Sequence, residues 1–171
     1  MNDLLKQLTL TADNWAKLGA PALCERFIAR NGQCFKGRKL PRSIKRGTPK
    51  QCFENSTHLV IDRDGLRYVE GYAMREDICF PFLHAWCIDR DGRVVDVTLT
   101  EPEKYQYVGI VLTRTKLWAE LAKNTYYGVL DSGLGLNAKF MFARDPELEG
   151  IVRAVTEDKI NWNRLLKENA A

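Results

Sequence analysis

Three residues in the middle of the chain, Cys52, His84 and Asp96, carry the side chains of a nucleophilic catalytic site. In such a site a thiolate attacks an acyl carbon, an imidazole moves the proton, and a carboxylate orients the imidazole. The sequence contains only 2 histidines. The other one, His58, would point well away from Cys52 because it lies six residues further along the same expected helix. The residue types therefore predict a Cys52–His84–Asp96 triad.

The residues before Cys52 predict the start of a helix. Thr48 can cap it, Pro49 suits its first position, and Gln51 can complete a capping box. A thiol in the first turn of a helix has a lowered pKa, because the positive end of the helix dipole stabilises the thiolate. The alternative is a buried cysteine that serves as a small apolar core residue. Cys34 is a rival nucleophile, expected in an exposed loop.

A predicted hairpin places His84 and Asp96 on the same face of a sheet. Its strands are residues 82–88 and 93–99, and its turn is residues 89–92. Strand alternation then brings Asp96 opposite His84, or diagonal to it if the glycine of the turn forms a bulge. A carboxylate among valines needs a partner, and an imidazole N–H is a natural one. The pair could equally be a structural hydrogen bond between strands.

Four further residues are candidates for supporting roles. Gln51 or Asn55 could donate a hydrogen bond to a developing oxyanion, as could backbone N–H groups at the start of the helix. Glu70 could be an acceptor behind the triad or belong to the polar face of its strand. Trp86 shares the face of His84 and could form a wall of the site, although a core tryptophan is the simpler interpretation.

The remaining pattern predicts an α+β fold, with a small antiparallel sheet packed with helices, in a single domain of residues 1–171. We expect a helical segment at 1–31 broken near 19–21, a basic loop at 36–50, a catalytic-like core at 51–113 with further strands at 66–73 and 105–112, and C-terminal helices at 114–171 that start near residues 113–115, 145 and 156.

Composition indicates an ordinary globular protein, with 45% hydrophobic residues and a net charge of +4. Neither a signal peptide nor an apolar stretch of about 20 residues is visible, so we expect a cytoplasmic protein. The 5 cysteines include no Cys-x-x-Cys pair, so neither a disulfide framework nor a metal site is expected. No cofactor is expected either.

The basic loop at residues 36–50 contains no acidic residue. Its cations are Lys36, Arg38, Lys39, Arg42, Lys45, Arg46 and Lys50. One interpretation is a solvated, mobile loop; the other is a rim that attracts an anionic substrate, nucleic acid or lipid surface. The nucleic-acid signal is weak because no aromatic residue apart from Phe35 lies near these charges.

The order Cys52, then His84-Ala85-Trp86, then Asp96-Val97-Thr98 resembles the papain-like and transglutaminase-like superfamily. Within residues 51–113, a longer pattern resembles a group of small bacterial and phage proteins of uncharacterised function; it consists of Gln51–Asn55, Tyr68–Ala73, His84–Cys87, Val94–Thr98 and Tyr107–Gly109. The first resemblance implies a papain-like core in which Cys52 attacks an acyl carbon, His84 shuttles the proton and Asp96 orients His84. Val97 follows Asp96 where such motifs often have proline.

Two functions are therefore open. The first is a cysteine enzyme for acyl transfer or amide hydrolysis, of the peptidase, deamidase or transamidase type, acting on a protein or peptide. The alternative is a non-enzymatic phage or bacterial module that binds a host protein or nucleic acid through residues 36–50. Hydrogen-bond reach between Cys52 and His84, beside a cleft, favours the enzyme.

Overall fold

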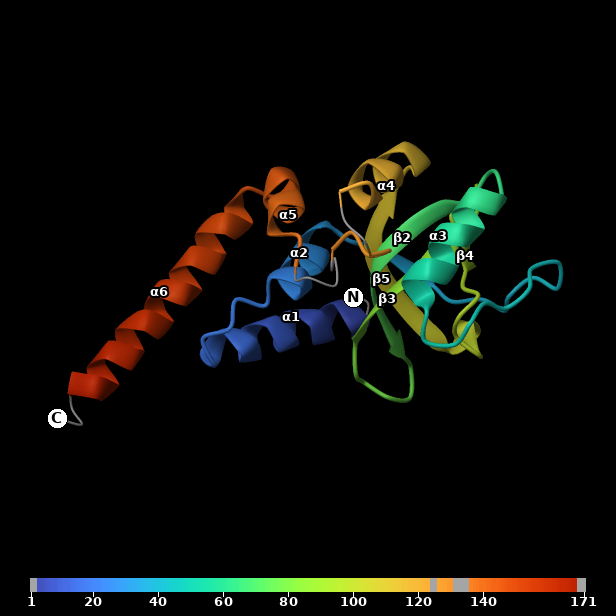
Figure 1. Cartoon of the computed structure of the whole chain (residues 1–171). Helices are drawn as coiled ribbons and strands as arrows, with labels where there is room; N and C mark the ends of the chain where they lie inside the picture. The colour runs from blue at the N-terminus through green and yellow to red at the C-terminus, as the bar shows by residue number, and fades with distance from the viewer. Residues whose placement is uncertain (1–2, 124–125, 131–135, 169–171) are drawn as a thin grey trace.

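The computed structural model describes residues 3–123, 126–130 and 136–168, with side chains up to residue 159. In this part of the chain, six α-helices pack with a curled, five-stranded antiparallel sheet of order β1-β5-β2-β3-β4 (Figure 1). The predicted α+β class is thus confirmed. The elements are α1 (Asp3–Lys17), α2 (Leu23–Asn31), β1 (Gln33–Lys36), α3 (Cys52–Asp62), β2 (Arg67–Arg75), β3 (Phe82–Ile88), β4 (Val94–Val95), the short 3-10 helix η1 (Pro102–Lys104), β5 (Tyr105–Leu112), α4 (Arg114–Leu121), α5 (Ala138–Arg144) and α6 (Glu147–Glu168).

Two glycines allow the central strands to approach closely. Gly71 of β2 pairs with Gly109 of β5 on one side and with His84 of β3 on the other. A Cβ atom on Gly71 would lie 2.2 Å from the carbonyl oxygen of Val108, and one on Gly109 would lie 2.7 Å from the ring of Trp86. Side chains at these positions would push the strands and the tryptophan apart, so the glycines permit the curl.

Each face of the sheet has its own apolar core. The larger core packs one face against the helices and includes Leu8, Phe27, Val60, Tyr68, Tyr72, Ala85, Cys87 and Val108. The smaller core covers the other face and consists of Val69, Ala73, Trp86, Ile88, Val94 and Tyr107. Neighbouring residues of β3 therefore contribute to opposite cores, as strand alternation requires.

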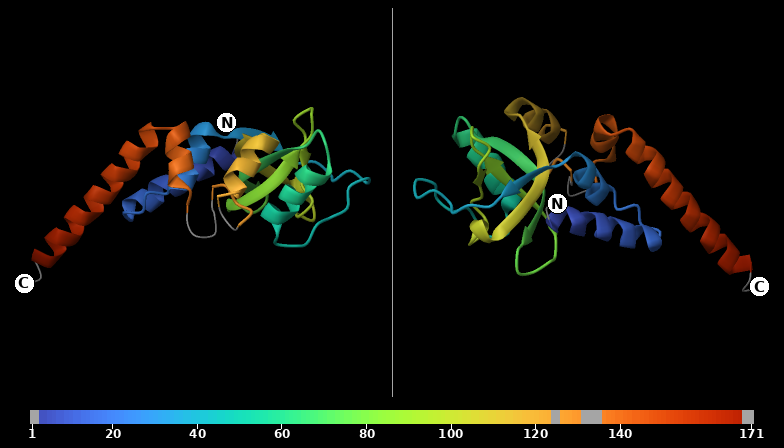
Figure 2. Two further views of the ribbon diagram at one scale, coloured as in Figure 1. Left: turned by 45° about the horizontal axis from the view of Figure 1, so that its top comes forward. Right: turned by 180° about the vertical axis from the view of Figure 1, so that it is seen from behind.

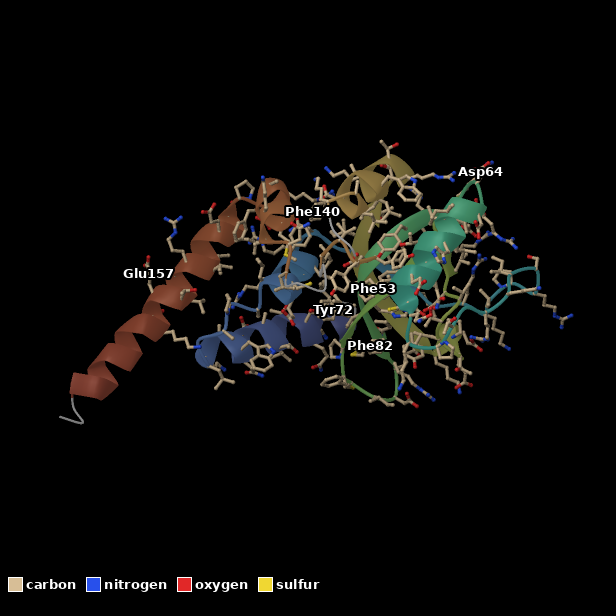
Figure 3. All side chains as sticks on the ribbon, viewed as in Figure 1. Phe53, Asp64, Tyr72, Phe82, Phe140 and Glu157 are labelled. Carbon is tan, nitrogen blue, oxygen red and sulfur yellow. The ribbon has the colours of Figure 1, made fainter. Side chains whose placement is uncertain are left out.

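The helices lie mainly to one side of the sheet. α1 and α2 pack together, and α6 extends away from the sheet beyond them (Figures 1 and 2). Phe140 of α5, labelled in Figure 3, points toward the neighbouring helices. Its ring packs edge to face against that of Phe27 of α2, with centroids 6.2 Å apart. Within the described residues, no helix is both long and apolar enough to cross a membrane.

Several sequence predictions of secondary structure are confirmed. β3 and β5 have the predicted bounds, and the expected break near residues 19–21 separates α1 from α2. Thr113 caps α4 by accepting a hydrogen bond from the backbone N–H of Lys116 at 3.2 Å. These elements follow from local apolar pattern and capping chemistry, which the sequence displays directly.

Two predictions of element boundaries were wrong. Of the strand expected at 93–99, only β4 (Val94–Val95) forms. The Asp96 carboxylate accepts the N–H groups of Thr98 and Leu99 and so turns the chain out of the sheet. The two helices expected from 145 and 156 are one continuous helix, α6. Thr156 does not cap a new helix; its hydroxyl donates to the carbonyl of Val152 within α6.

The sequence also missed two elements. Cys34, expected in a loop, lies in edge strand β1 opposite Val108, although its side chain is exposed as predicted. The short helix α5 is capped by Asn137, whose side chain accepts from the N–H of Phe140. Both elements are short, which leaves too few residues for a periodic pattern.

Candidate active site

Cys52 is the first residue of α3, and its side chain is largely buried where that helix begins. The predicted capping box at Thr48 is wrong: Gln51 is the N-cap residue without a side-chain cap, and residues 49–50 form a turn. Lys50 in this turn has a φ of 67°. The helix thus starts three residues later than the capping box required, but the thiol still lies in its first turn.

The start of α3 lies beside β3 at the point where β4 no longer pairs with it. β4 pairs with β3 only at Cys87 and Ile88, and further along α3 the Cys87 thiol donates to the carbonyl of Ser56 at 3.3 Å. This packing places the Cys52 thiol beside the His84 side chain and the backbone of Ala85, and both lower its pKa.

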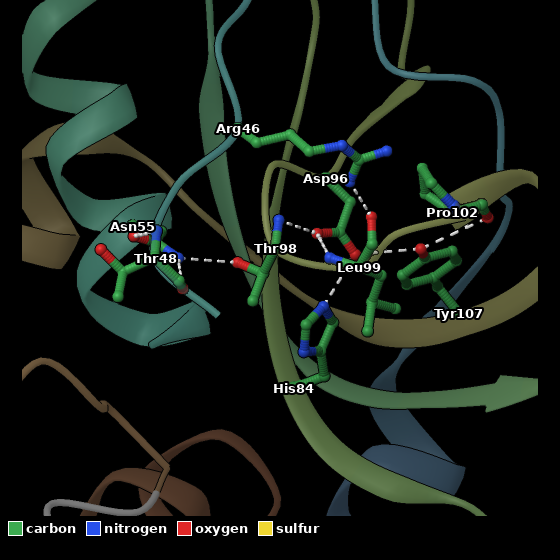
Figure 4. Close-up of polar contacts among 9 residues, drawn as sticks. All are labelled: Arg46, Thr48, Asn55, His84, Asp96, Thr98, Leu99, Pro102 and Tyr107. Carbon is green, nitrogen blue, oxygen red and sulfur yellow. Dashed lines mark hydrogen bonds and ion pairs between the residues drawn. The ribbon is translucent and has the colours of Figure 1, made fainter. Parts of the chain in front are cut away.

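His84 and Asp96 form a buried pair, with Nε2 of His84 2.8 Å from Oδ2 of Asp96 (Figure 4). The register of β3 and β4, extended by one residue, sets Asp96 opposite Trp86 and therefore diagonal to His84. Gly92 in the turn has a φ of 77°. The predicted shared face, in its diagonal form, is confirmed, and because Nε2 bonds Asp96, Nδ1 is the ring nitrogen of His84 that this pair leaves available.

Four hydrogen bonds hold the Asp96 carboxylate (Figure 4). Oδ1 accepts the N–H groups of Thr98 at 2.8 Å and Leu99 at 3.1 Å, while Oδ2 accepts His84 and the hydroxyl of Tyr107 at 3.0 Å. The sequence analysis missed Tyr107. No sequence signal pairs it with Asp96, because β5 lies three strands from β4 in the sheet order and only the curl brings the two together.

The electrostatics of the site favour a charged thiolate and imidazolium. Burial lowers the pKa of His84, but the charge and hydrogen bond of Asp96, with a further contribution from Cys52, raise it to about 9. Burial raises the pKa of the Cys52 thiol, yet its hydrogen bond and attraction to His84 outweigh this and leave the pKa below its ordinary value. Burial likewise opposes ionisation of Asp96, but His84 and the two backbone N–H groups hold its pKa below normal.

Trp86 lies behind the imidazole as a core residue. It is fully buried, and its ring stacks on that of His84 with an angle of 13° between planes and 6.2 Å between centroids. It also packs against Tyr107 at 4.9 Å and Phe35 at 5.9 Å. These contacts fix the plane of the His84 ring.

The other predicted supporting residues have different surroundings. Gln51 is exposed at the start of α3. The Asn55 amide donates to the carbonyl of Thr48 at 2.7 Å and the hydroxyl of Thr98 at 3.0 Å, and its oxygen accepts the N–H of Thr48 (Figure 4). Asn55 therefore clamps the segment before Cys52 to the segment after Asp96. This leaves the N–H groups of the first turn of α3 as the donors nearest an oxyanion at Cys52.

Glu70 lies on the face of β2 opposite to the one that His84 occupies on β3. It is fully buried, and its carboxylate accepts the Tyr68 hydroxyl at 3.0 Å and the N–H groups of Val129 and Leu130, each at 2.8 Å. Its partners there belong to the larger core, so the structure does not bring it to the triad.

A cleft of about 470 Å³ opens onto Cys52 and His84. Lys50 and Leu83 line it near the thiol, and residues 98–101 form another wall. Neither Cys34 nor His58 belongs to the lining; His58 is exposed on α3 and packs against Tyr127. Among the described residues, no three histidine, cysteine or acidic side chains are grouped as metal ligands.

Comparison with known proteins found no relative. No protein-family model matches the chain, and searches of the curated proteins and of the solved structures found no similar protein. The resemblance to papain-like and transglutaminase-like proteins is thus neither supported nor contradicted by a relative, and the geometry of the site has to carry the functional argument.

Proposed function

We propose that this protein is a cysteine-dependent enzyme that hydrolyses an amide or transfers its acyl group. Cys52 is the nucleophile, His84 the proton carrier and Asp96 the residue that orients His84. The observation that carries the proposal is the buried His84–Asp96 pair at 2.8 Å, which shares a cleft with a thiol whose pKa His84 lowers.

The reaction has two steps. The Cys52 thiolate attacks the carbonyl carbon, and when the C–N bond breaks, His84 gives its proton to the leaving amine, so that a thioester remains on Cys52. Water or a second amine then attacks the thioester while His84 accepts its proton. The thiolate leaves and the ion pair is restored. Asp96 keeps its charge throughout and stabilises the imidazolium.

The assignment of an amide as the substrate rests on the resemblance to papain-like and transglutaminase-like enzymes. Cys52 begins helix α3, His84 lies on β3, and Asp96 directly follows β4, the strand that pairs with β3. This order supports the interpretation that the resemblance suggests. A purely structural His–Asp hydrogen bond would need neither the thiol nor the cleft. The His84–Asp96 pair, the thiol of lowered pKa, its place in the first turn of a helix and the adjacent cleft occur together. This combination favours a catalytic role over a purely structural one.

Selective alkylation tests the nucleophile. At a pH of about 5.5 an ordinary thiol has little thiolate, whereas the His84-paired thiol of Cys52 keeps more of it. We expect iodoacetamide to modify Cys52 at least about tenfold faster than the exposed Cys34 and Cys79, as measured by peptide mass spectrometry. Asp96→Asn should reduce this rate. If Cys52 reacts no faster than the two exposed thiols, the enzyme proposal fails and the non-enzymatic binding module remains.

A further inference from the structure

We propose that the enzyme acts on a protein or peptide that carries an acidic segment next to the reactive amide. A basic hollow beside the cleft binds that segment. This inference rests on the proposed function and names its substrate class. The basic hollow has a volume of about 320 Å³, and the lining residues that matter here are Lys39, Arg42, Arg46, Thr100 and Glu103.

The basic hollow and the catalytic cleft share a wall. Thr100 lines both. The guanidinium of Arg46 donates to the backbone carbonyls of Leu99 and Thr100, and so joins the loop to the segment that follows Asp96. A chain that leaves Cys52 along this wall passes Thr100 and enters the basic hollow.

The loop that forms the basic hollow is tied to the body at several points, in contrast to the mobile loop of one sequence interpretation. Arg38 bonds the carbonyl of Val94 and the carboxylate of Asp89, each at 2.8 Å. Arg63 bonds the carbonyl of Ser43 at 3.0 Å, and the N–H of Gly47 bonds the carbonyl of Val97 at 2.9 Å. The cations are thus presented at fixed places, which reduces the entropy that binding would cost.

The basic hollow keeps a net positive charge, because its own carboxylates do not balance its cations. Lys39 and Arg42 are exposed, and no carboxylate of the described residues pairs with them. Arg46 bonds only neutral carbonyls there, so its positive charge is retained. Glu103 is the single carboxylate among the lining residues, against three cations. An anionic segment is the complementary partner.

The aromatic residues favour a protein partner over a nucleic acid. Single-stranded nucleic acid is held by bases stacked on exposed rings. The lining of the basic hollow contains no aromatic residue. Phe35, the nearest aromatic residue in the sequence, packs on Trp86 in the smaller core. The proposed reaction at an amide also calls for a peptide.

Matched affinity labels test this inference. A bromoacetyl-diglycyl peptide ending in four glutamates is compared with the same peptide ending in four glutamines, and the rate of Cys52 modification is followed by mass spectrometry. We expect the acidic label to react at least about tenfold faster at low salt. Lys39→Gln/Arg42→Gln should bring the ratio near one. Lys36→Gln/Lys45→Gln removes the same charge from exposed positions outside the hollow and should preserve the ratio.

Direct binding separates this inference from the proposed function. Fluorescein-labelled hexaglutamate should bind by fluorescence anisotropy, and only the Lys39/Arg42 variant should lose binding, even if Cys52 proves unreactive with iodoacetamide. Equal loss in the two double variants, or equal rates for the two labels in the wild type, would overturn the basic hollow as the acidic-segment site. Tighter binding of oligothymidylate than of hexaglutamate, lost on the same substitutions, would overturn it in favour of nucleic acid.

Discussion

Asp96 is the residue on which the charge of the site depends. It is only 1% exposed, and a buried carboxylate is costly unless it is paired and hydrogen-bonded. Two backbone N–H groups, an imidazole and a phenol supply the four bonds that offset this cost. The Asp96 charge then holds the proton on His84, and His84 in turn lowers the pKa of Cys52.

The raised pKa of His84 predicts a pH-dependent stability in Cys52→Ala. In the wild type the pKa of His84 is about 9 in the folded protein and 6.5 ordinarily. Without the contribution of Cys52, Asp96 raises this pKa less far, so in Cys52→Ala the stabilising contribution is complete below pH 6.5 and is lost before pH 9 is reached. We expect the free energy of unfolding to fall by about 2 kcal/mol over this range. In the wild type the fall should be shallower, because the lowered pKa of Cys52 adds stability as the pH rises.

Urea unfolding at several pH values measures this effect. Cys34→Ala removes an exposed thiol and should behave like the wild type. A Cys52→Ala curve that is as shallow as that of the wild type would show that the thiol and His84 are not coupled.

Tyr107→Phe should weaken the site without disrupting the smaller core. The change removes one donor to Oδ2 of Asp96 and keeps the ring contact with Trp86. We expect a loss of about 1 kcal/mol in the free energy of unfolding. We also expect the pH profile of Cys52 alkylation to shift downward, because an Asp96 carboxylate with one donor fewer stabilises the imidazolium of His84 more strongly. Tyr105→Phe is the control, since its hydroxyl is not among the donors to Asp96; the same downward shift there would contradict the role of Tyr107.

At the scale of elements, the sequence was most informative where the decisive interactions are local. The alternation of β3 and the glycine turn were enough to predict that His84 and Asp96 share a face. The end of β4 was missed because the buried Asp96 carboxylate accepts the N–H groups of Thr98 and Leu99. The start of α3 was missed because the Asn55 side chain bonds the backbone of Thr48 and leaves residues 49–50 in a turn.

Non-local contacts account for most of what the sequence did not reveal. Tyr107 reaches Asp96 across the curl of the sheet, and Arg46 reaches Leu99 and Thr100 from a loop more than 50 positions earlier. Neither apolar periodicity nor a capping residue indicates that residues so far apart in the sequence lie in contact. The candidate triad was predictable because its residue types are chemically distinctive and the sequence has only 2 histidines and 5 cysteines, whereas the residues that hold it in place are of ordinary types.

Gly71→Ala should demonstrate that the curl needs a glycine pair. The added Cβ meets the backbone of Val108 and Gly109, which cannot move away as a side chain would. We expect a loss of at least about 2 kcal/mol in the free energy of unfolding and a slower alkylation of Cys52. Gly150→Ala in α6, where a Cβ meets nothing within 4 Å, should instead add about 0.5 kcal/mol. Equal effects of the two variants in chemical denaturation would contradict this account of the curl.

At the scale of the molecule, the two faces of the sheet have different roles. One face carries the larger core and the packing of the helices, and Glu70 on that face bonds the N–H groups of Val129 and Leu130. The other face and its edge carry His84, Asp96 and the cleft. The stability of the larger core and the proposed chemistry thus depend on buried carboxylates on opposite faces, Glu70 and Asp96, so substitutions at these two positions should be separable in their effects.

Glu70→Gln tests this separation. The glutamine amide places an N–H₂ group where the carboxylate accepted three donors, so at least one buried N–H or O–H loses its acceptor. We expect a loss of about 2 kcal/mol in the free energy of unfolding, measured in urea, whereas the exposed Glu76→Gln should change it little. The pH profile of Cys52 alkylation should stay that of the wild type, because Glu70 bonds neither His84 nor Asp96 in the contacts that hold the triad. A shift in that profile would show that Glu70 acts on the candidate triad, as the sequence analysis had allowed.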